Sequence, residues 1–208
     1  PFRRLVFIGA GIGITSCLYF LKMLAFSSQG GYLLIQAVLL IVVLIALFLQ
    51  KRISLHSLPR SLSFTRYQLL IGLTAVLVAV VTFSYSINFA RLAPHGDYDA
   101  QAIWNLRARS IYRLGNAWEN AFSPLINRNF HMDYPLLIPL SVVGGWNTLS
   151  GEVLRVPAVL SILFLFGLAG IVYTTTAYLR SGSQAALVLI LLLATPGLLL
   201  YSTFQTAD

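Results

Sequence analysis

YLLIQAVLLIVVLIALFLQ, residues Tyr32–Gln50, is the stretch that decides the fold class. It contains no charged side chain, and a membrane-spanning helix needs about 20 mostly apolar residues. The whole chain has the same character, because 58% of its residues are hydrophobic and only 10% are charged. A soluble domain has about 25% charged residues. The sequence therefore predicts an all-α polytopic membrane protein.

Four further apolar runs are long enough to span a bilayer. They are Leu5–Phe26, Tyr67–Ala90, Val156–Leu179 and Gln184–Tyr201, so we expect about five transmembrane helices. Leu5–Phe26 is too long for a cleaved signal peptide and no A-x-A-like site follows it, which favours a membrane anchor. Because the chain stops at Asp208 directly after an apolar run, we expect it to be the N-terminal part of a longer protein.

The basic residues predict the orientation of these helices. Cytoplasmic loops are rich in Lys and Arg, so Arg3 and the loop Lys51–Arg66, which has no acid, should lie inside. Residues 1–66 would then form an N-terminal transmembrane hairpin with a basic cytoplasmic loop. Residues 67–208 would form the main module, with a long external segment at 91–155.

The segment Tyr134–Ser150 leaves two topologies open. It is short for a span and contains two prolines and adjacent glycines, which is more typical of a re-entrant or interfacial helix. If it spans the bilayer, Arg180 is external. If it lies in the interface, Arg180 is cytoplasmic and Asp208 returns to the external face. The positive-inside rule favours the second topology.

The acidic residues are absent from the first 96 positions and then gather in and after the external segment; they are Asp97, Asp99, Glu119, Asp133, Glu152 and Asp208. Two of them open the stretch PHGDYDAQAIWNLRARSIYRLG, residues 94–115, which has helical periodicity. Its apolar face comprises Ile103, Trp104, Leu106, Ile111 and Leu114, and its polar stripe comprises Gln101, Asn105, Arg109 and Arg113. We expect an amphipathic juxtamembrane helix that lies on the membrane and ends at Gly115.

Structural roles, without any part in catalysis or binding, can also explain several of these residues. Asp97 is a plausible N-cap and Asp99 lies in the first turn, where carboxylates favour the helix dipole. Arg107 projects from the apolar face and needs a partner such as a carboxylate or a lipid phosphate. Arg109 and Arg113 are expected to contact lipid headgroups. Glu119 and Glu152 are expected to be solvated loop residues, and Asp133 and Asp208 could simply mark a turn and a water-exposed helix end.

Other classes of site are disfavoured. The single cysteine, Cys17, excludes an internal disulfide, and three histidines without HxxxH spacing argue against a zinc site. The formal charge is +8, but the basic residues form no dense cluster with aromatics. We therefore expect no binding to nucleic acid.

Three motifs together resemble the GT-C superfamily of membrane glycosyltransferases, in particular bacterial relatives of the dolichyl-phosphate-mannose protein mannosyltransferases and of the lipid A aminoarabinose transferase. A D-A-x-x-x-W-x-x-(K/R)-A pattern is similar to Asp99, Ala100, Trp104, Arg107 and Ala108. An H-x-D-Y-P-L-L-x-P pattern matches His131, Asp133, Tyr134, Pro135 and Pro139. The family has a second acidic residue, which usually follows an alanine. Asp208, at the end of the stretch YSTFQTAD, matches it. The resemblance covers residues 91–208.

The resemblance implies an enzyme that moves a hexose or pentose from a polyprenyl-phosphate donor to a lipid, glycan or protein acceptor. The active site would face outward from the cytoplasmic (inner) membrane, and the reaction would invert the anomeric centre. Asp99 would be the catalytic base, with Asp97 the alternative, and Asp99 and Asp208 could hold Mg²⁺ or Mn²⁺. The residues expected to bind the donor phosphate or the acceptor are Arg107, His131, Asp133, Tyr134 and Asp208.

Two other functions stay open at this point. One is a non-catalytic membrane subunit of a cell-envelope polymer assembly or export system, which would use the external segment as a docking surface. The other is a transporter, which would show intramembrane charges or helices broken by Gly or Pro.

Overall fold

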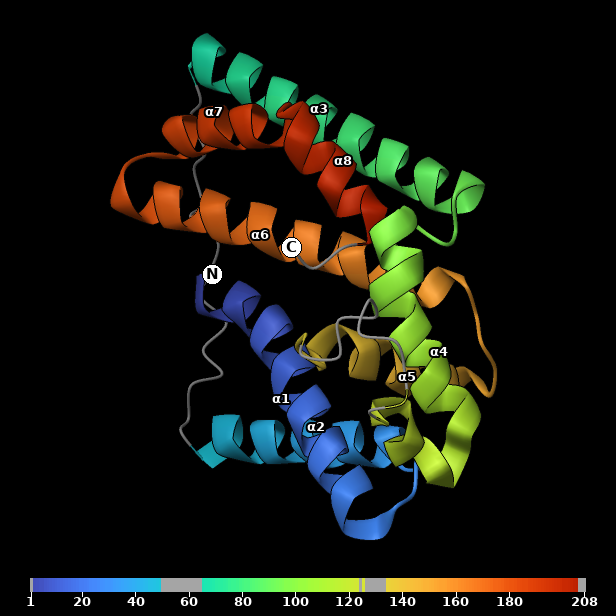
Figure 1. Ribbon diagram of the computed structural model, residues 1–208. Helices are drawn as coiled ribbons and strands as arrows, with labels where there is room; N and C mark the ends of the chain where they lie inside the picture. The colour runs from blue at the N-terminus through green and yellow to red at the C-terminus, as the bar shows by residue number, and fades with distance from the viewer. Residues whose placement is uncertain (1, 50–64, 124, 126–133, 206–208) are drawn as a thin grey trace.

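The computed structural model describes residues 2–49, 65–123, 125 and 134–205, and every regular element in these ranges is a helix (Figure 1). The elements are α1 (Phe2–Phe26), α2 (Tyr32–Leu49), α3 (Arg66–Leu92), η1 (Ala100–Trp104), α4 (Asn105–Leu114), η2 (Gly115–Phe122), α5 (Leu137–Leu149), α6 (Arg155–Leu179), α7 (Gly182–Leu193) and α8 (Pro196–Phe204). The predicted all-α class is confirmed for this part of the chain.

Two of the helices are long and apolar enough to cross a membrane by length and composition. These are α3 and α6, which correspond to two of the predicted spans. The bent pair of α7 and α8 would make a third. Among the residues with described placement, Ala10–Phe26, Tyr32–Ala46 and α5 form shorter apolar helical segments. The described part of the chain therefore supports two or three spanning elements, where the sequence predicts five.

The predicted span Gln184–Tyr201 is not one straight helix. It divides into α7 and α8, whose axes differ by 63°. Pro196 has no N–H to donate and its ring clashes with the carbonyl four residues earlier, so a helix cannot continue through it. Thr195 is extended, as the residue before a proline prefers, and Pro196 takes the first turn of α8.

Three helices form one layer, in which α7 lies between α3 and α6 (Figure 1). Its interior includes Leu165, Ala169 and Leu193. At one end, here the polar end, α3 finishes, α6 begins and the backbone N–H of Asp97 donates to the Phe204 carbonyl at 3.2 Å. At the other, here the arginine end, Arg66 begins α3 and Arg180 follows α6.

This arrangement bears on the two topologies that the sequence leaves open. Arg66 and Arg180 lie at the same end of the layer, as they should if both are cytoplasmic. The ambiguous segment Tyr134–Ser150 contains α5, a helix of 13 residues, which is about 20 Å long at 1.5 Å per residue and too short to cross a bilayer core of about 30 Å. Both observations favour the topology in which this segment does not span.

The remaining helices enclose a second core below this layer. Tyr19 and Met23 of α1, Ile111 of α4, Trp118 of η2 and Trp146 of α5 are all almost fully buried there. Helix α5 thus packs inside the protein rather than on its surface.

Polar contacts tie the N-terminal hairpin to this core. The Ser16 and Ser141 hydroxyls lie 2.7 Å apart, and Asn147 Nδ2 donates to the Tyr19 hydroxyl at 2.7 Å. The Tyr32 ring lies so close to Gly144 that a Cβ on this glycine would meet it at 2.3 Å. Helices α1 and α2 therefore share one core with α4 and α5.

Candidate functional site

The helix that carries the first two acids starts as the sequence predicts. Asp97 Oδ1 accepts a hydrogen bond from the Ala100 N–H at 3.0 Å, and the Asp97 carbonyl accepts from the Gln101 N–H at 3.1 Å. Asp97 is therefore the N-cap. The partly exposed side chain of Asp99 makes no capping hydrogen bond. Of the two carboxylates, only that of Asp97 accepts a hydrogen bond that caps the helix.

A π-turn follows the cap and changes which side chains face inward. In η1 the Asn105 N–H donates to the Ala100 carbonyl, five residues back, so one extra residue is accommodated in the turn. Asn105, which the periodicity assigns to the polar stripe, is only 2% exposed, while Leu114 of the expected apolar face is 38% exposed. A regular 3.6-residue period cannot anticipate this shift.

The inward face of this helix contacts protein. Trp104, Ala108 and Ile111 are buried, and α4 packs against α5 and η2. The sequence predicts that the apolar face lies on the membrane. In the structure, neighbouring helices cover Trp104 and Ile111 of that face, while Leu114 is 38% exposed.

Arg107 is the charged residue that the sequence places on the apolar face, and it is indeed buried, with 6% exposure. Its Nη1 donates to the Tyr134 carbonyl at 3.0 Å, and its guanidinium carbon lies 6.0 Å from the Phe122 ring centre. These are two of the contacts that Arg107 makes, and its pairing with a carboxylate or a lipid phosphate stays a prediction.

Tyr134 belongs to the second motif and lies against the first. Its ring centre is 5.4 Å from that of Trp104, and its carbonyl is held by Arg107. The preceding motif residues His131 and Asp133 lie outside the described residues. Because Asp133 is the immediate chain neighbour of Tyr134, the second motif reaches the start of α4.

The chain segment that precedes Asp208, the acid of the third motif, also reaches the start of this helix. Gln205 is 3% exposed; its Oε1 accepts from Asn105 Nδ2 at 3.3 Å and its Nε2 donates to the Pro94 carbonyl at 3.3 Å. Asp208 follows three residues later and lies outside the described residues. Segments far apart in sequence therefore converge on the first turns of the helix that carries Asp97 and Asp99.

Gly96 makes this convergence possible. Its φ of +72° is in the left-handed region, and a Cβ there would lie 2.4 Å from the Phe204 carbonyl oxygen. Only glycine combines this backbone conformation with so close an approach of another chain segment.

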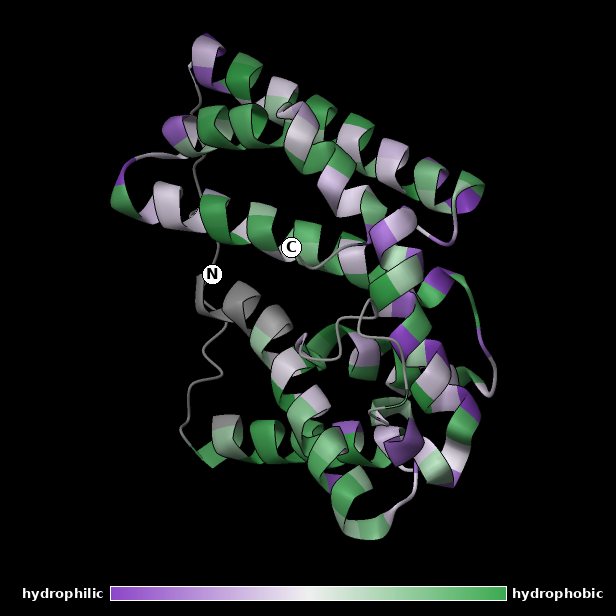
Figure 2. Ribbon diagram, in the orientation of Figure 1, coloured by the Kyte–Doolittle hydropathy of each residue, from purple (hydrophilic) through white to green (hydrophobic). Residues whose placement is uncertain are grey.

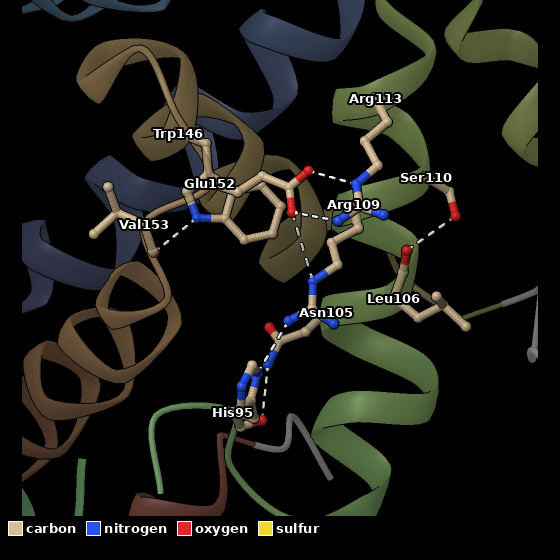
Figure 3. Close-up of polar contacts among 9 residues, drawn as sticks. All are labelled: His95, Asn105, Leu106, Arg109, Ser110, Arg113, Trp146, Glu152 and Val153. Atoms are coloured by element: carbon tan, nitrogen blue, oxygen red, sulfur yellow. Dashed lines mark hydrogen bonds and ion pairs between the residues drawn. The ribbon is translucent and has the colours of Figure 1, made fainter. Parts of the chain in front are cut away.

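A cluster of charged residues covers the outer side of α4 (Figure 3). Glu152 accepts hydrogen bonds from Arg113 Nε at 2.6 Å and Arg113 Nη2 at 3.0 Å, and lies 3.8 Å from Arg109 Nε. Arg109 Nη2 and His95 Nδ1 are 3.1 Å apart. The hydrogen bonds from Arg113 lower the pKa of the Glu152 carboxyl below its ordinary value of 4.5.

This cluster corrects two expectations. Arg109 and Arg113 are predicted to contact lipid headgroups, but they pair with Glu152, which is predicted to be a solvated loop residue. Glu152 is 39 residues from Arg113 in the chain, so no local spacing could reveal the pair. The Trp146 indole N–H donates to the Val153 carbonyl at 2.9 Å and thereby fixes the loop next to Glu152.

A groove of about 700 Å³ leads away from these residues between α5, α6 and α8. Trp104, Tyr134 and Gln205 line it where the motifs converge, and Leu165, Leu168 and Leu198 line its part inside the helical layer. Trp104 Nε1 and Asn105 Oδ1 are buried and have no hydrogen-bond partner among the residues that the structure describes. The groove is amphipathic, because Tyr134 and Gln205 line one end and leucines line the other.

The predicted metal site, Asp99 with Asp208, has only Asp99 within the described residues. In the residues with described placement, no three His, Cys, Asp or Glu side chains come close enough to hold a metal ion. A divalent cation at this site stays a prediction, and we derive no step from it.

Comparisons of the chain with protein-family models, with curated proteins and with solved structures gave no match.

Proposed function

We propose that the chain is part of a membrane glycosyltransferase that uses a polyprenyl-phosphate sugar at the external face of the cytoplasmic membrane. One observation carries the proposal. The segments next to Asp133 and Asp208 both meet the helix start that presents Asp99, at the polar end of an apolar groove. The acceptor would be a lipid, glycan or protein, and the bilayer supplies the donor.

The groove has the chemistry that such a donor requires. A polyprenyl chain needs an apolar channel, for which Leu165, Leu168 and Leu198 provide the walls. A sugar phosphate needs hydrogen-bond donors at the end of that channel. Trp104 and Gln205 belong to this part of the lining, and we expect the lipid to enter from the bilayer and present its head beside Asp99.

The proposed reaction is a displacement at the anomeric carbon. Asp99 accepts the proton of the acceptor hydroxyl or amine as the new bond to the sugar forms. The bond between the sugar and the lipid phosphate breaks on the opposite face, which inverts the anomeric centre. Arg107 holds the Tyr134 carbonyl, and its positive charge would favour the departing phosphate.

One observation favours the transporter alternative, namely the break between α7 and α8 at Pro196. Transporters often bind substrates at discontinuous helices near the bilayer midplane. The residues at this break, Ala194 and Thr195, carry no charge, whereas five carboxylates lie in the segment 91–155. We therefore prefer the transferase.

The test compares Asp99→Asn with Asp97→Asn in the full-length protein, reconstituted in vesicles with a panel of polyprenyl-phosphate sugars. General-base catalysis contributes about 10²- to 10⁴-fold, so Asp99→Asn should fold, insert and lose turnover by at least about 100-fold. Asp97→Asn keeps a capping side chain and should retain most turnover. Full turnover of Asp99→Asn would exclude this residue as the base. An equal loss in both variants would contradict the division of roles between the two acids.

A further inference from the structure

A second groove lies at the arginine end, away from the proposed active site. It has a volume of about 740 Å³ and runs between the first turns of α3, the last turns of α6 and the first turns of α7. Its polar lining residues are Gln68, Tyr173, Ser181 and Ser183, and its other lining residues are Leu69, Gly72, Leu73, Ala75, Val76, Ala79, Gly182, Ala186 and Leu189. None of these residues lines the first groove.

The small residues on α3 and α7 leave the groove open. A Cβ added at Gly72 or at Gly182 would meet no atom within 4 Å. Leu69, Leu73 and Val76 supply an apolar wall with exposed side chains. The space along the helices is thus unfilled and mostly apolar, and an apolar lining suits an acyl chain better than a small polar solute.

Two exposed arginines are chain neighbours of residues that line the groove. Arg66 lies two residues before Gln68 and Arg180 directly precedes Ser181, and both arginines are exposed. Neither forms an ion pair with any residue that the structure describes. The acids with described positions all belong to the segment 91–155, and none of them forms an ion pair with Arg66 or Arg180. Figure 2 shows hydrophilic residues gathered at these ends of α3, α6 and α7, on the left of the view.

We propose that this groove binds an anionic phospholipid, with one acyl chain between α3 and α7 and the headgroup phosphate between Arg66 and Arg180. An arginine guanidinium matches phosphate oxygens in charge and geometry, and the serine hydroxyls and the Gln68 amide supply further donors. The inference rests on membrane insertion and on no step of sugar transfer. It assigns the arginine end to lipid binding at the cytoplasmic face.

The test is native mass spectrometry of the full-length protein released from vesicles of equal parts phosphatidylglycerol and phosphatidylcholine. The wild type should retain one phosphatidylglycerol in excess over phosphatidylcholine. A cationic residue near an anionic lipid raises binding about five-fold. The double variant Arg66→Gln/Arg180→Gln should therefore lower the retention of phosphatidylglycerol by about ten-fold or more.

A steric variant separates the groove from general surface charge. Gly72→Leu places a side chain in open space inside the groove, so the protein should fold normally and lose both lipids. Gly11→Leu is the matched control, because Gly11 also has no atom within 4 Å of an added Cβ but lies on α1. It should retain lipid as the wild type does.

Two results would overturn the proposal. One is equal retention of phosphatidylglycerol by the wild type, Gly72→Leu and the double arginine variant. The other is a dimer that Gly72→Leu disrupts and that carries no lipid, because the groove would then belong to a second copy of the chain. Sugar transfer, measured on the same samples with lipid-depleted and replenished vesicles, reports separately on the proposed enzyme. Loss of transferase activity in every sample, with lipid binding intact, would contradict only that function.

Discussion

The two ends of the layer formed by α3, α6 and α7 are built from the same apolar helices but finish in different ways. At the polar end, the chain gathers Asp97, Asp99 and Glu152, and buries the amides of Asn105 and Gln205 in hydrogen bonds. At the arginine end, Arg66 and Arg180 flank an open groove without an acid among the described residues. The difference indicates where the molecule fixes side chains in place and where it leaves them available to a charged lipid.

The cost of burying polar groups explains why the polar end is so closely connected. A buried amide without partners costs about 1–3 kcal/mol, and Asn105 and Gln205 meet part of this cost by bonding each other and the turn at Pro94. Those bonds also lock α8 to the start of the helix that carries Asp99. At the arginine end, Arg66 and Arg180 are exposed and form no ion pair with any described residue.

The largest expected effect comes from substituting one glycine at each end. Gly96→Ala forces a Cβ toward the Phe204 carbonyl at a positive φ, so it should lower the free energy of unfolding by about 2–4 kcal/mol and separate α8 from the turn. Gly72→Ala adds a methyl group to an open helix position and should stabilise the protein by about 0.5–1 kcal/mol. Thermal or denaturant unfolding in detergent measures both.

Equal stabilities for these two variants would contradict the prediction, because the close contact at the polar end would then make no difference to the free energy of unfolding. Gly115→Ala provides the intermediate case. Its φ of +57° and ψ of −123° are unfavourable for an L residue, but no atom lies within 4 Å of an added Cβ, so only backbone strain of about 1–3 kcal/mol should appear. Substitution by alanine should therefore destabilise the protein most at Gly96, less at Gly115 and not at all at Gly72.

Removal of the Glu152 charge should have a smaller effect. Glu152→Gln loses the charge-assisted bonds to Arg113, which are partly screened by solvent, so the midpoint of thermal unfolding should fall by about 1–3 °C at neutral pH. The pKa of the Glu152 carboxyl is lowered in the folded state. Its stabilisation is therefore complete above the unfolded value of 4.5 and is lost as the pH falls through the lower folded value.

The corresponding measurement is the difference in melting temperature between the wild type and Glu152→Gln as a function of pH. The difference should be constant from neutral pH down to about 5 and shrink under more acidic conditions. Arg180→Gln at the arginine end is the control, because Arg180 has no carboxylate partner among the described residues; its melting difference should not vary in this range. A difference for Glu152→Gln that grows on acidification would contradict the assigned pair.

The sequence predicts the features that depend on local composition. The all-α class, the long apolar helices α3 and α6, the N-cap at Asp97 and the burial of Arg107 follow from apolar length, capping preference and helical spacing. Proline chemistry also explains the break at Pro196, although apolar length alone predicts an uninterrupted span there.

Features that depend on distant contacts could not be predicted. The π-turn at Ala100–Trp104 changes which side of the helix Asn105 faces, and no periodicity signals it. The pairing of Glu152 with Arg113 and the docking of Gln205 beside Asn105 join residues that are far apart in the chain. Of the candidate site residues, His131, Asp133 and Asp208 lie outside the described residues, so their roles stay predictions.

The central claim is that the two ends of the helical layer lie on opposite sides of a membrane, with the polar end outside. Cysteine labelling tests it most directly, in a Cys17→Ser background because Cys17 is exposed. Tyr98→Cys probes the polar end, where Tyr98 is 80% exposed, and Arg180→Cys probes the other. In right-side-out vesicles, a membrane-impermeant maleimide should label the first directly and the second only after permeabilisation. Labelling of both positions in intact vesicles, or the reverse order, would contradict the account.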